Sequence, residues 1–302
     1  MRRRDALRLI GAAGLGMTTQ RANAAGSGAR GPLLTRPIPS TGEALPVVGL
    51  GTWQTFDVAP SARPGLEAVL GAFVELGGTL VDSSPMYGRS EEVVGDLAAE
   101  LGLQPKLFLA TKVWTSGKAA GVRQMEDSMR KLKATRIDLM QVHNLVDVDT
   151  HLDTLAAWKR EGRVRYVGVT HYTAGHHDAV ARIIAARPVD FVQINYSVGE
   201  REAESRLLPL ARERGVAVLA NRPFAGGDVF RRLRSRPLPE WAAEIDCTSW
   251  AQVLLKFVVS HPAITCAIPA TSQAAHLRDN MQAARGRLPD AALRTRIAAE
   301  AV

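Results

Sequence analysis

The stretch "IDLMQVHNLVDVDTHLDTLAAWKREGRVRYVGVT", residues 137–170, decides the fold of this chain. Its first and last seven residues are short, mainly apolar runs, typical of strands that are buried on both faces of a sheet. Residues 151–162 between them have apolar positions at helical spacing and end at Gly162, a residue type common at helix C-termini. The stretch therefore predicts a strand, a helix and a second strand parallel to the first.

The same unit recurs on both sides of this stretch. Repeated strand–helix units in one domain of about 250 residues predict a (β/α)8 TIM barrel, an α/β fold. Residues 33–45 are expected to form a small N-terminal hairpin at the bottom of the barrel, and residues 222–247 a long loop after the seventh strand. A doubly wound sheet is the alternative, but no G-x-G-x-x-G motif follows the first strand. The predicted strands are residues 46–51, 79–82, 107–112, 137–143, 164–170, 191–196, 216–221 and 265–269.

The composition is that of an ordinary globular protein. The chain has 302 residues, of which 46% are hydrophobic and 23% charged. The formal net charge of +8 falls to +4, 33 bases against 29 acids, when residues 1–24 are set aside. So small an excess does not indicate a nucleic-acid partner. The two cysteines, Cys247 and Cys266, lack metal-ligand spacing, and nothing in the sequence supports a disulfide between them.

The N-terminus has the pattern of an export signal. Arginines precede a short apolar run, and Ala22-Asn23-Ala24 forms an A-x-A cleavage site. The Arg3-Arg4 pair resembles a twin-arginine signal, which the export machinery reads to carry folded proteins. We therefore expect a signal peptide at residues 1–24, a linker at 25–32, a barrel domain at 33–302 and a periplasmic location without a membrane anchor. A general secretion signal and an uncleaved basic tail are the alternatives.

Polar residues follow the predicted strands where a barrel carries its active site. Asp82, Lys112 and His143 end three adjacent strands, and Tyr87 lies on the loop beside them. A phenol has a pKa near 10, which a neighbouring ammonium lowers, and a carboxylate keeps that ammonium charged. An imidazole can orient a carbonyl oxygen. Such a set delivers a proton to an oxygen, and the hydride that must accompany it implies a nicotinamide cofactor.

Residues 33–282 resemble the aldo-keto reductases. The resemblance rests on "VVGLGTW", "LVDSSPMYGRSEEVVG", "TKVW", "DLMQVHN", "VRYVGVTHY", "VQINYS" and "IPATSQAAHLRDN", in the order and spacing of that family. It implies NAD(P)H-dependent reduction of aldehydes or ketones to alcohols by a monomer. It also implies a catalytic tetrad of Asp82, Tyr87, Lys112 and His143, in which Tyr87 is the general acid and Asp82 supports Lys112.

The resemblance also implies a cofactor site. His171 would contact the nicotinamide with Thr170 and Gln193, and its imidazole can offer one donor and one acceptor, as an amide does. Ala270 and His276 stand where many relatives carry Lys and Arg. We therefore expect NADPH to bind more tightly than NADH by a reduced margin, with NADH left open. The other implied cofactor residues are Gly51, Thr52, Asn221, Pro223, Phe224, Thr271, Ser272 and Asn280, and Trp53, Phe56 and Trp114 would line the substrate mouth.

Two other functions compete with the reductase. One is a nicotinamide-binding redox sensor or partner protein on the same barrel, with slow or no turnover. The other is a metal-dependent barrel hydrolase, but its ligands are missing from the sequence. His176 and His177 are adjacent at the start of a helix and cannot face one ion together. Turnover of a generic aldehyde would separate a reductase from a sensor.

Overall fold

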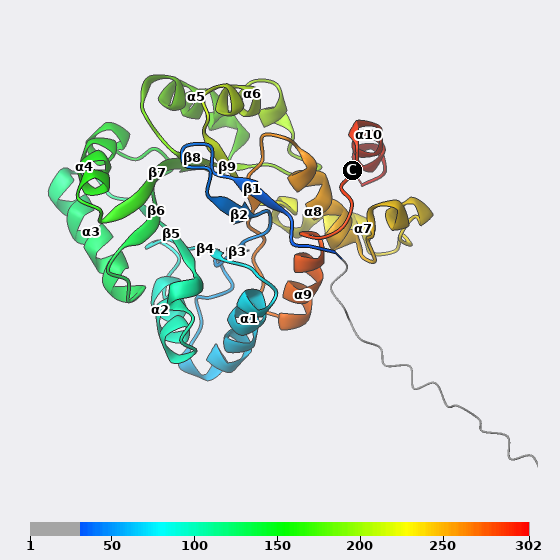
Figure 1. Cartoon of the computed structure of the whole chain (residues 1–302), viewed down its shortest axis with the longest axis horizontal. Helices are drawn as coiled ribbons and strands as arrows, with labels where there is room; N and C mark the ends of the chain where they lie inside the picture. Colours follow the sequence, from blue (N-terminus) through cyan, green and yellow to red (C-terminus); the bar gives the residue numbers. More distant parts are fainter. Residues whose placement is uncertain (1–30, 302) are drawn as a thin grey trace, which may run out of the picture.

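The computed structural model describes residues 31–301, so the predicted signal peptide and most of the linker lie outside the described residues. The central sheet is a parallel barrel with the strand order β10-β9-β8-β7-β6-β5-β4-β3 (Figure 1). Parallel bridges from Val48 to Ala267 and from Gly51 to Ala270 join its two edges. The strands are β3 (Leu50–Gly51), β4 (Leu80–Asp82), β5 (Phe108–Val113), β6 (Ile137–His143), β7 (Val164–His171), β8 (Phe191–Asn195), β9 (Ala217–Asn221) and β10 (Cys266–Ala267). The predicted barrel is confirmed.

Helices surround the barrel, so each strand is covered on its outer face (Figure 1). The expected helix C-terminal glycines have the left-handed backbone that favours glycine, with φ of +91° at Gly77 and +75° at Gly162. One hydrophobic core fills the layer between sheet and helices, and a second fills the barrel interior. The helices of this ring are α1 (Arg63–Glu75), α2 (Ser90–Glu100), α3 (Lys118–Lys131), α4 (Val148–Arg160), α5 (His177–Ala186), α6 (Leu207–Glu213), α8 (Trp250–Ser260) and α9 (Ala274–Gln282).

The predicted N-terminal hairpin is present as β1 (Thr35–Pro37) and β2 (Ala44–Pro46), which pair antiparallel. Ile38 and Leu45 are buried with the residues of the barrel interior. The Tyr166 hydroxyl, on β7, donates to the Glu43 carboxylate at 2.5 Å and lies 2.8 Å from the Thr41 hydroxyl. The hairpin therefore closes the end of the barrel opposite the site described below.

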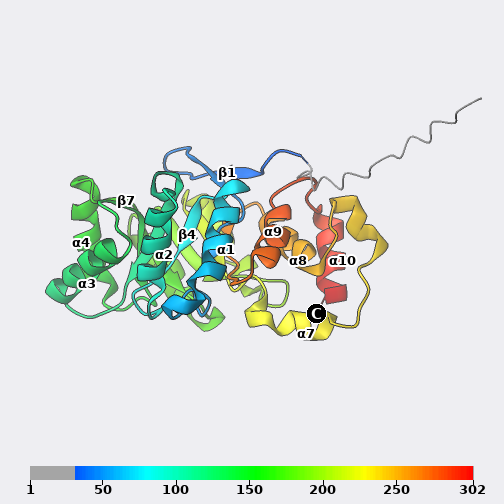
Figure 2. The same cartoon turned by 90° about the horizontal axis from the view of Figure 1, so that it is seen from below.

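The segment 222–247 differs from the sequence prediction, because it is not an open loop. It contains α7 (Asp228–Leu233) and the short 3-10 helices η5 (Ala225–Gly227) and η6 (Glu240–Ile245). These helices are too short to show a clear period, and contacts with distant residues hold them. α10 (Ala291–Ala301) packs against α7 and α8, and Figure 2 shows this group at one end of the molecule.

Both cysteines are free and buried. Among residues 31–301, none of the helices is both long enough and apolar enough to cross a membrane.

Candidate active site

The four residues predicted as a tetrad meet at the carboxyl end of the barrel. Lys112, on β5, is fully buried, and its Nζ donates to the Asp82 carboxylate at 2.7 Å and to the Ser83 carbonyl at 2.6 Å. The same Nζ lies 5.0 Å from the centroid of the Tyr87 ring. The Tyr87 and His143 rings meet edge to face, with their centroids 6.0 Å apart. The structure thus places a buried acid, ammonium and imidazole in one cluster with a half-buried phenol.

Two side-chain amides, in addition to Lys112, donate hydrogen bonds to the Asp82 carboxylate. Its Oδ1 accepts hydrogen bonds from Gln193 Nε2 at 2.8 Å and from Gln141 Nε2 at 3.3 Å. Gly168, on the adjacent strand, leaves room for Gln141, because a Cβ there would come within 3.1 Å of the Gln141 Cγ. Burial opposes the charged form of Lys112, but Asp82 and then Tyr87 favour it, and its pKa is raised. Asp82 therefore keeps Lys112 charged, as expected, and Gln141 is a contributor that the sequence analysis missed.

The expected lowering of the Tyr87 pKa is wrong as a net effect. Burial raises the pKa of Tyr87 most, Lys112 lowers it, and Asp82 raises it again, so the pKa lies above the usual value of a phenol. The free energy needed to remove a phenolate from water exceeds the stabilisation that the nearby ammonium provides. Tyr87 consequently keeps its proton at neutral pH, which is the state that a proton donor requires.

His143 is a neutral imidazole. Burial, and then the charges of Lys112 and His171, lower the pKa of His143 to about 3. Its Nδ1 lies 3.1 Å from the Ser84 hydroxyl, which fixes the ring plane. A neutral imidazole can donate one hydrogen bond to a carbonyl oxygen without itself protonating it.

His171 has fewer free hydrogen-bonding groups than the donor and acceptor of an amide that we expected of it. Its Nδ1 accepts the Thr173 backbone N–H at 3.3 Å, which places the ring proton on Nε2. The Thr173 hydroxyl lies 3.2 Å from that Nδ1 and 3.0 Å from Nδ1 of His176, whose ring stacks on His171 with centroids 3.7 Å apart. Burial, then the neighbouring His176 and His177, lower the pKa of His171 to about 4. His171 therefore presents a donor only.

Gln193 supplies the hydrogen-bond acceptor that His171 lacks. Its amide nitrogen is committed to Asp82, and its Oε1 accepts the Thr170 hydroxyl at 3.3 Å. A carbonyl oxygen has two lone pairs, so Gln193 retains acceptor capacity. Thr170 and Gln193 are register partners on β7 and β8, and both are buried beside the tetrad.

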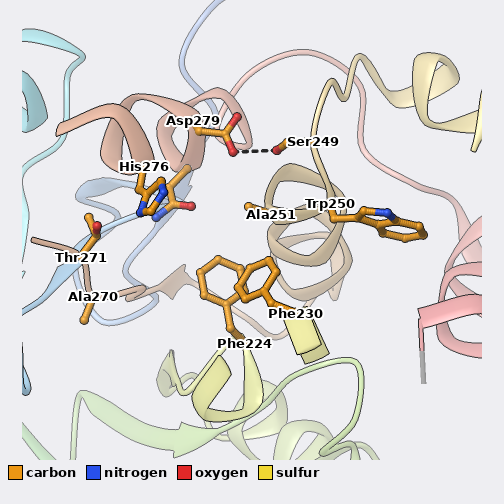
Figure 3. A pocket seen from close by; sticks show the side chains of 10 residues that line it. Phe224, Phe230, Ser249, Trp250, Ala251, Ala270, Thr271, His276 and Asp279 are labelled. Carbon is orange, nitrogen blue, oxygen red and sulfur yellow. Dashed lines mark hydrogen bonds between the residues drawn. The ribbon is translucent and has the colours of Figure 1, made fainter. Parts of the chain in front are cut away.

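A cavity of about 400 Å³ lies between the start of α9 and the segment after β9 (Figure 3). Five predicted cofactor residues line it, namely Phe224, Ala270, Thr271, His276 and Asn280. Five further residues that line it were not predicted: Phe230, Ser249, Trp250, Ala251 and Asp279. The other predicted cofactor residues lie elsewhere.

Gly51 and Thr52 support the barrel and the tetrad instead of this cavity. A Cβ at Gly51 would come within 2.8 Å of the Ile268 carbonyl, so glycine permits the approach of β3 and β10. The Thr52 hydroxyl donates to the Asp82 carbonyl at 2.9 Å. Asn221 ends β9 with its Oδ1 buried and without a hydrogen-bond partner among the described residues, whereas Ser272 is exposed and Pro223 is buried outside the cavity lining.

Large apolar side chains surround the mouth above the tetrad. Trp53 is 47% exposed and Trp114 is 41% exposed, and Met86 and Tyr172, which the sequence analysis did not name, are similarly exposed. All four follow the carboxyl ends of strands. The prediction for Phe56 is wrong: its side chain is fully buried in the outer core, where it packs with apolar residues, and does not line the mouth.

The family model described as "Aldo/keto reductase family" matches residues 47–295. A methylglyoxal reductase (YeaE) of Escherichia coli K12 is 33% identical over 244 residues, covering 78% of this chain and 84% of its own. An aldo-keto reductase of Klebsiella pneumoniae, solved in complex with NADPH, has a TM-score of 0.77 at 25% identity and covers 89% of this chain and 95% of its own. A second one from Klebsiella pneumoniae, solved with NADP and acetate, has a TM-score of 0.70 at 26% identity, over 85% of this chain and 92% of its own.

Proposed function

We propose that this chain, which belongs to the aldo/keto reductase family, reduces aldehydes or ketones to alcohols with NADPH and uses Tyr87 as the proton donor. The observation that carries the proposal is the buried cluster in which Asp82 holds Lys112 at 2.7 Å beside Tyr87. A buried ammonium with one carboxylate partner, set against a protonated phenol, is an arrangement suited to supplying a proton to a developing alkoxide.

The side chains of the cluster have separable roles. Tyr87 carries the proton, because its pKa lies above the usual value. Lys112 stabilises the phenolate that remains after the proton has left, and Asp82 maintains the charge on Lys112. His143 stays neutral and can orient the carbonyl oxygen toward Tyr87. Solvent then returns a proton to Tyr87 after each turnover.

The described residues fit a nicotinamide dinucleotide. The Asn280 side chain is 4% exposed and lines the 400 Å³ cavity, so its amide can hydrogen-bond with a ligand placed there. The free N–H of His171 and the acceptor oxygen of Gln193 are suited to the two sides of a carboxamide. The bound dihydronicotinamide supplies a hydride, that is, the two electrons that the carbonyl carbon takes up.

The four exposed apolar side chains at the mouth favour an apolar or aromatic carbonyl. Trp114 lies beside the tetrad, with its ring centroid 6.4 Å from that of His143. Exposed aromatic rings next to a reacting centre gain free energy when a flat apolar substrate covers them. We therefore place aryl aldehydes and quinones ahead of a three-carbon substrate such as the methylglyoxal in the name of the Escherichia coli relative.

The test is a cofactor-oxidation assay over a panel of aldehydes, ketones and quinones with NADPH. We expect turnover of several carbonyls, with the aryl members fastest. Tight binding of NADPH without turnover of any carbonyl would refute the reductase and support a redox sensor. A protein that binds no nicotinamide nucleotide would refute both.

We also propose that the protein is exported in folded form and acts in the periplasm. The support is the sequence Arg3-Arg4 followed by a short apolar run and Ala22-Asn23-Ala24. A folded-protein route would let a nucleotide acquired in the cytoplasm cross with the enzyme. Arg3→Lys combined with Arg4→Lys should retain the precursor in the cytoplasm, as cell fractionation would show; unchanged export would remove the proposal.

A further inference from the structure

The 400 Å³ cavity beside α9 carries information on which dinucleotide it accepts. We propose that it holds the adenosine half of the cofactor without selecting for a 2′-phosphate, so that NADH and NADPH bind with similar affinity. This inference rests on the proposed function, because it assumes that a nicotinamide dinucleotide is the ligand. It differs from the sequence resemblance, which implies that NADPH binds more tightly than NADH.

The walls of the cavity carry no fixed positive charge. Neither lysine nor arginine is among the lining residues in the described part of the chain. Arg278, one residue before Asp279 on α9, is exposed and pairs with Glu75 of α1 at 3.1 Å. Arg222, before the Phe224 wall, pairs with Glu200 at 3.6 Å. These two guanidinium groups are therefore paired with carboxylates, and neither arginine lines the cavity.

One lining residue, Asp279, is instead an acid and is held in place. Its Oδ2 accepts the Ser249 hydroxyl at 2.7 Å (Figure 3). Its Oδ1 accepts the Gln252 amide at 2.6 Å. These two donors tie α9 to α8, so the carboxylate cannot swing away from the cavity. Asp279 therefore gives a phosphate dianion no attraction, and its two hydrogen-bond donors offset part of its own negative charge.

The same walls suit an adenine base. The Phe224 and Phe230 rings lie together at one wall, with centroids 4.8 Å apart, and offer an apolar surface to a flat ring (Figure 3). The Asn280 amide, which lines the cavity, can both donate and accept at the edge of a purine. The Asp279 carboxylate can accept from an exocyclic amine. Recognition therefore depends on groups that NADH and NADPH share.

The expected ratio of NADPH to NADH affinity follows from the lack of lysine or arginine contacts to the 2′-phosphate. A charge-assisted hydrogen bond to phosphate contributes about tenfold or more in affinity. None is available here from a lysine or arginine among the lining residues. We therefore expect dissociation constants for NADPH and NADH within about threefold of each other.

The experiment is a titration of intrinsic fluorescence with each nucleotide, repeated as a thermal-shift measurement that needs no turnover. Ala270→Lys places an ammonium at the cavity wall, and Ala275→Lys places one on an exposed part of α9 that does not line the cavity. Ala270→Lys should tighten NADPH about tenfold and leave NADH unchanged. Ala275→Lys should change the ratio by less than about twofold.

Each outcome decides a different point. A wild type that binds NADPH ten or more times as tightly as NADH overturns this inference and leaves the reductase standing. Equal effects of Ala270→Lys and Ala275→Lys also overturn it, because the 2′ position would then lie outside the cavity. A protein that binds neither nucleotide overturns the proposed function instead.

Discussion

Tyr87 is subject to opposing effects, and the balance among them sets its chemistry. Burial keeps the phenol protonated, while Lys112 favours the phenolate. We predict that Tyr87→Phe folds and binds cofactor but loses about 10²–10⁴ in carbonyl reduction, because only the proton donor is removed. Steady-state rates and nucleotide titrations check this. Tyr172→Phe removes an exposed phenol outside the tetrad and serves as the matched control; a Tyr87→Phe enzyme with near-normal rates would contradict the assignment.

Lys112 is the group that lowers the Tyr87 pKa. Replacing it with methionine removes that cation, so the pKa of Tyr87 should rise further. The two amides on Asp82, from Gln141 and Gln193, remain to hold the carboxylate in place. We predict that the pH–rate profile of Lys112→Met has its alkaline limb at higher pH than the wild type, with a lower maximum. Coincident profiles would mean that Lys112 does not tune Tyr87.

At the scale of elements, each βα loop contributes one part of the site. The loops after β3, β4, β5 and β7 supply the exposed apolar side chains, while the strands beneath them supply the buried charges. Apart from Tyr87, which lies on the loop after β4, this division separates recognition from chemistry, as is usual for loops on a rigid barrel. Changes in the loops should therefore alter substrate choice more than the chemical step.

Trp114→Ala tests this division. Losing the indole removes apolar contact with a flat substrate, so KM for an aryl aldehyde should rise about tenfold, equivalent to about 1.4 kcal/mol. KM for methylglyoxal, which is too small to cover the rim, should change by less than about twofold. Steady-state kinetics with both substrates on one preparation provide the internal control. Equal losses for the two substrates would place Trp114 outside substrate recognition.

At the scale of the whole molecule, buried histidines make stability depend on pH. The pKa of His143 is lowered to about 3, and those of His171 and His261 to about 4, in each case mainly by burial. In the unfolded chain they would titrate near 6.5, so the unfolded state binds more protons than the folded state between these values. The free energy of unfolding should therefore fall as pH drops from 6.5 toward 4.

Urea denaturation at pH 7.5, 6.0 and 5.0 measures this dependence. Glu91, whose pKa is raised by burial, acts in the opposite direction by favouring the folded state at low pH, but it is one group against three. His261→Gln removes one of the three without touching the tetrad and should make the decline shallower. A free energy of unfolding that stays constant from pH 7.5 to 5.0 would contradict the prediction.

The amino-acid sequence by itself was sufficient for the barrel, for the hairpin beneath it and for the placing of Asp82, Tyr87, Lys112 and His143 at one end of the barrel. These depend on local signals: apolar runs mark strands, helical spacing marks helices, and the parallel fold then brings the strand ends together. Asp82 and Lys112 could be paired in advance because they end neighbouring strands.

Tertiary structure alone decided the surroundings of those residues. Gln193 reaches Asp82 across 111 positions of the chain, and no local pattern records that contact. The net pKa of Tyr87 depends on how much water burial removes, Phe56 packs into the outer core instead of the mouth, and α7 is held by packing that its short sequence does not indicate. The physical reason is common to all: periodicity along the chain reports which face is buried, whereas desolvation, charge and hydrogen-bond partners depend on distances between segments far apart in sequence.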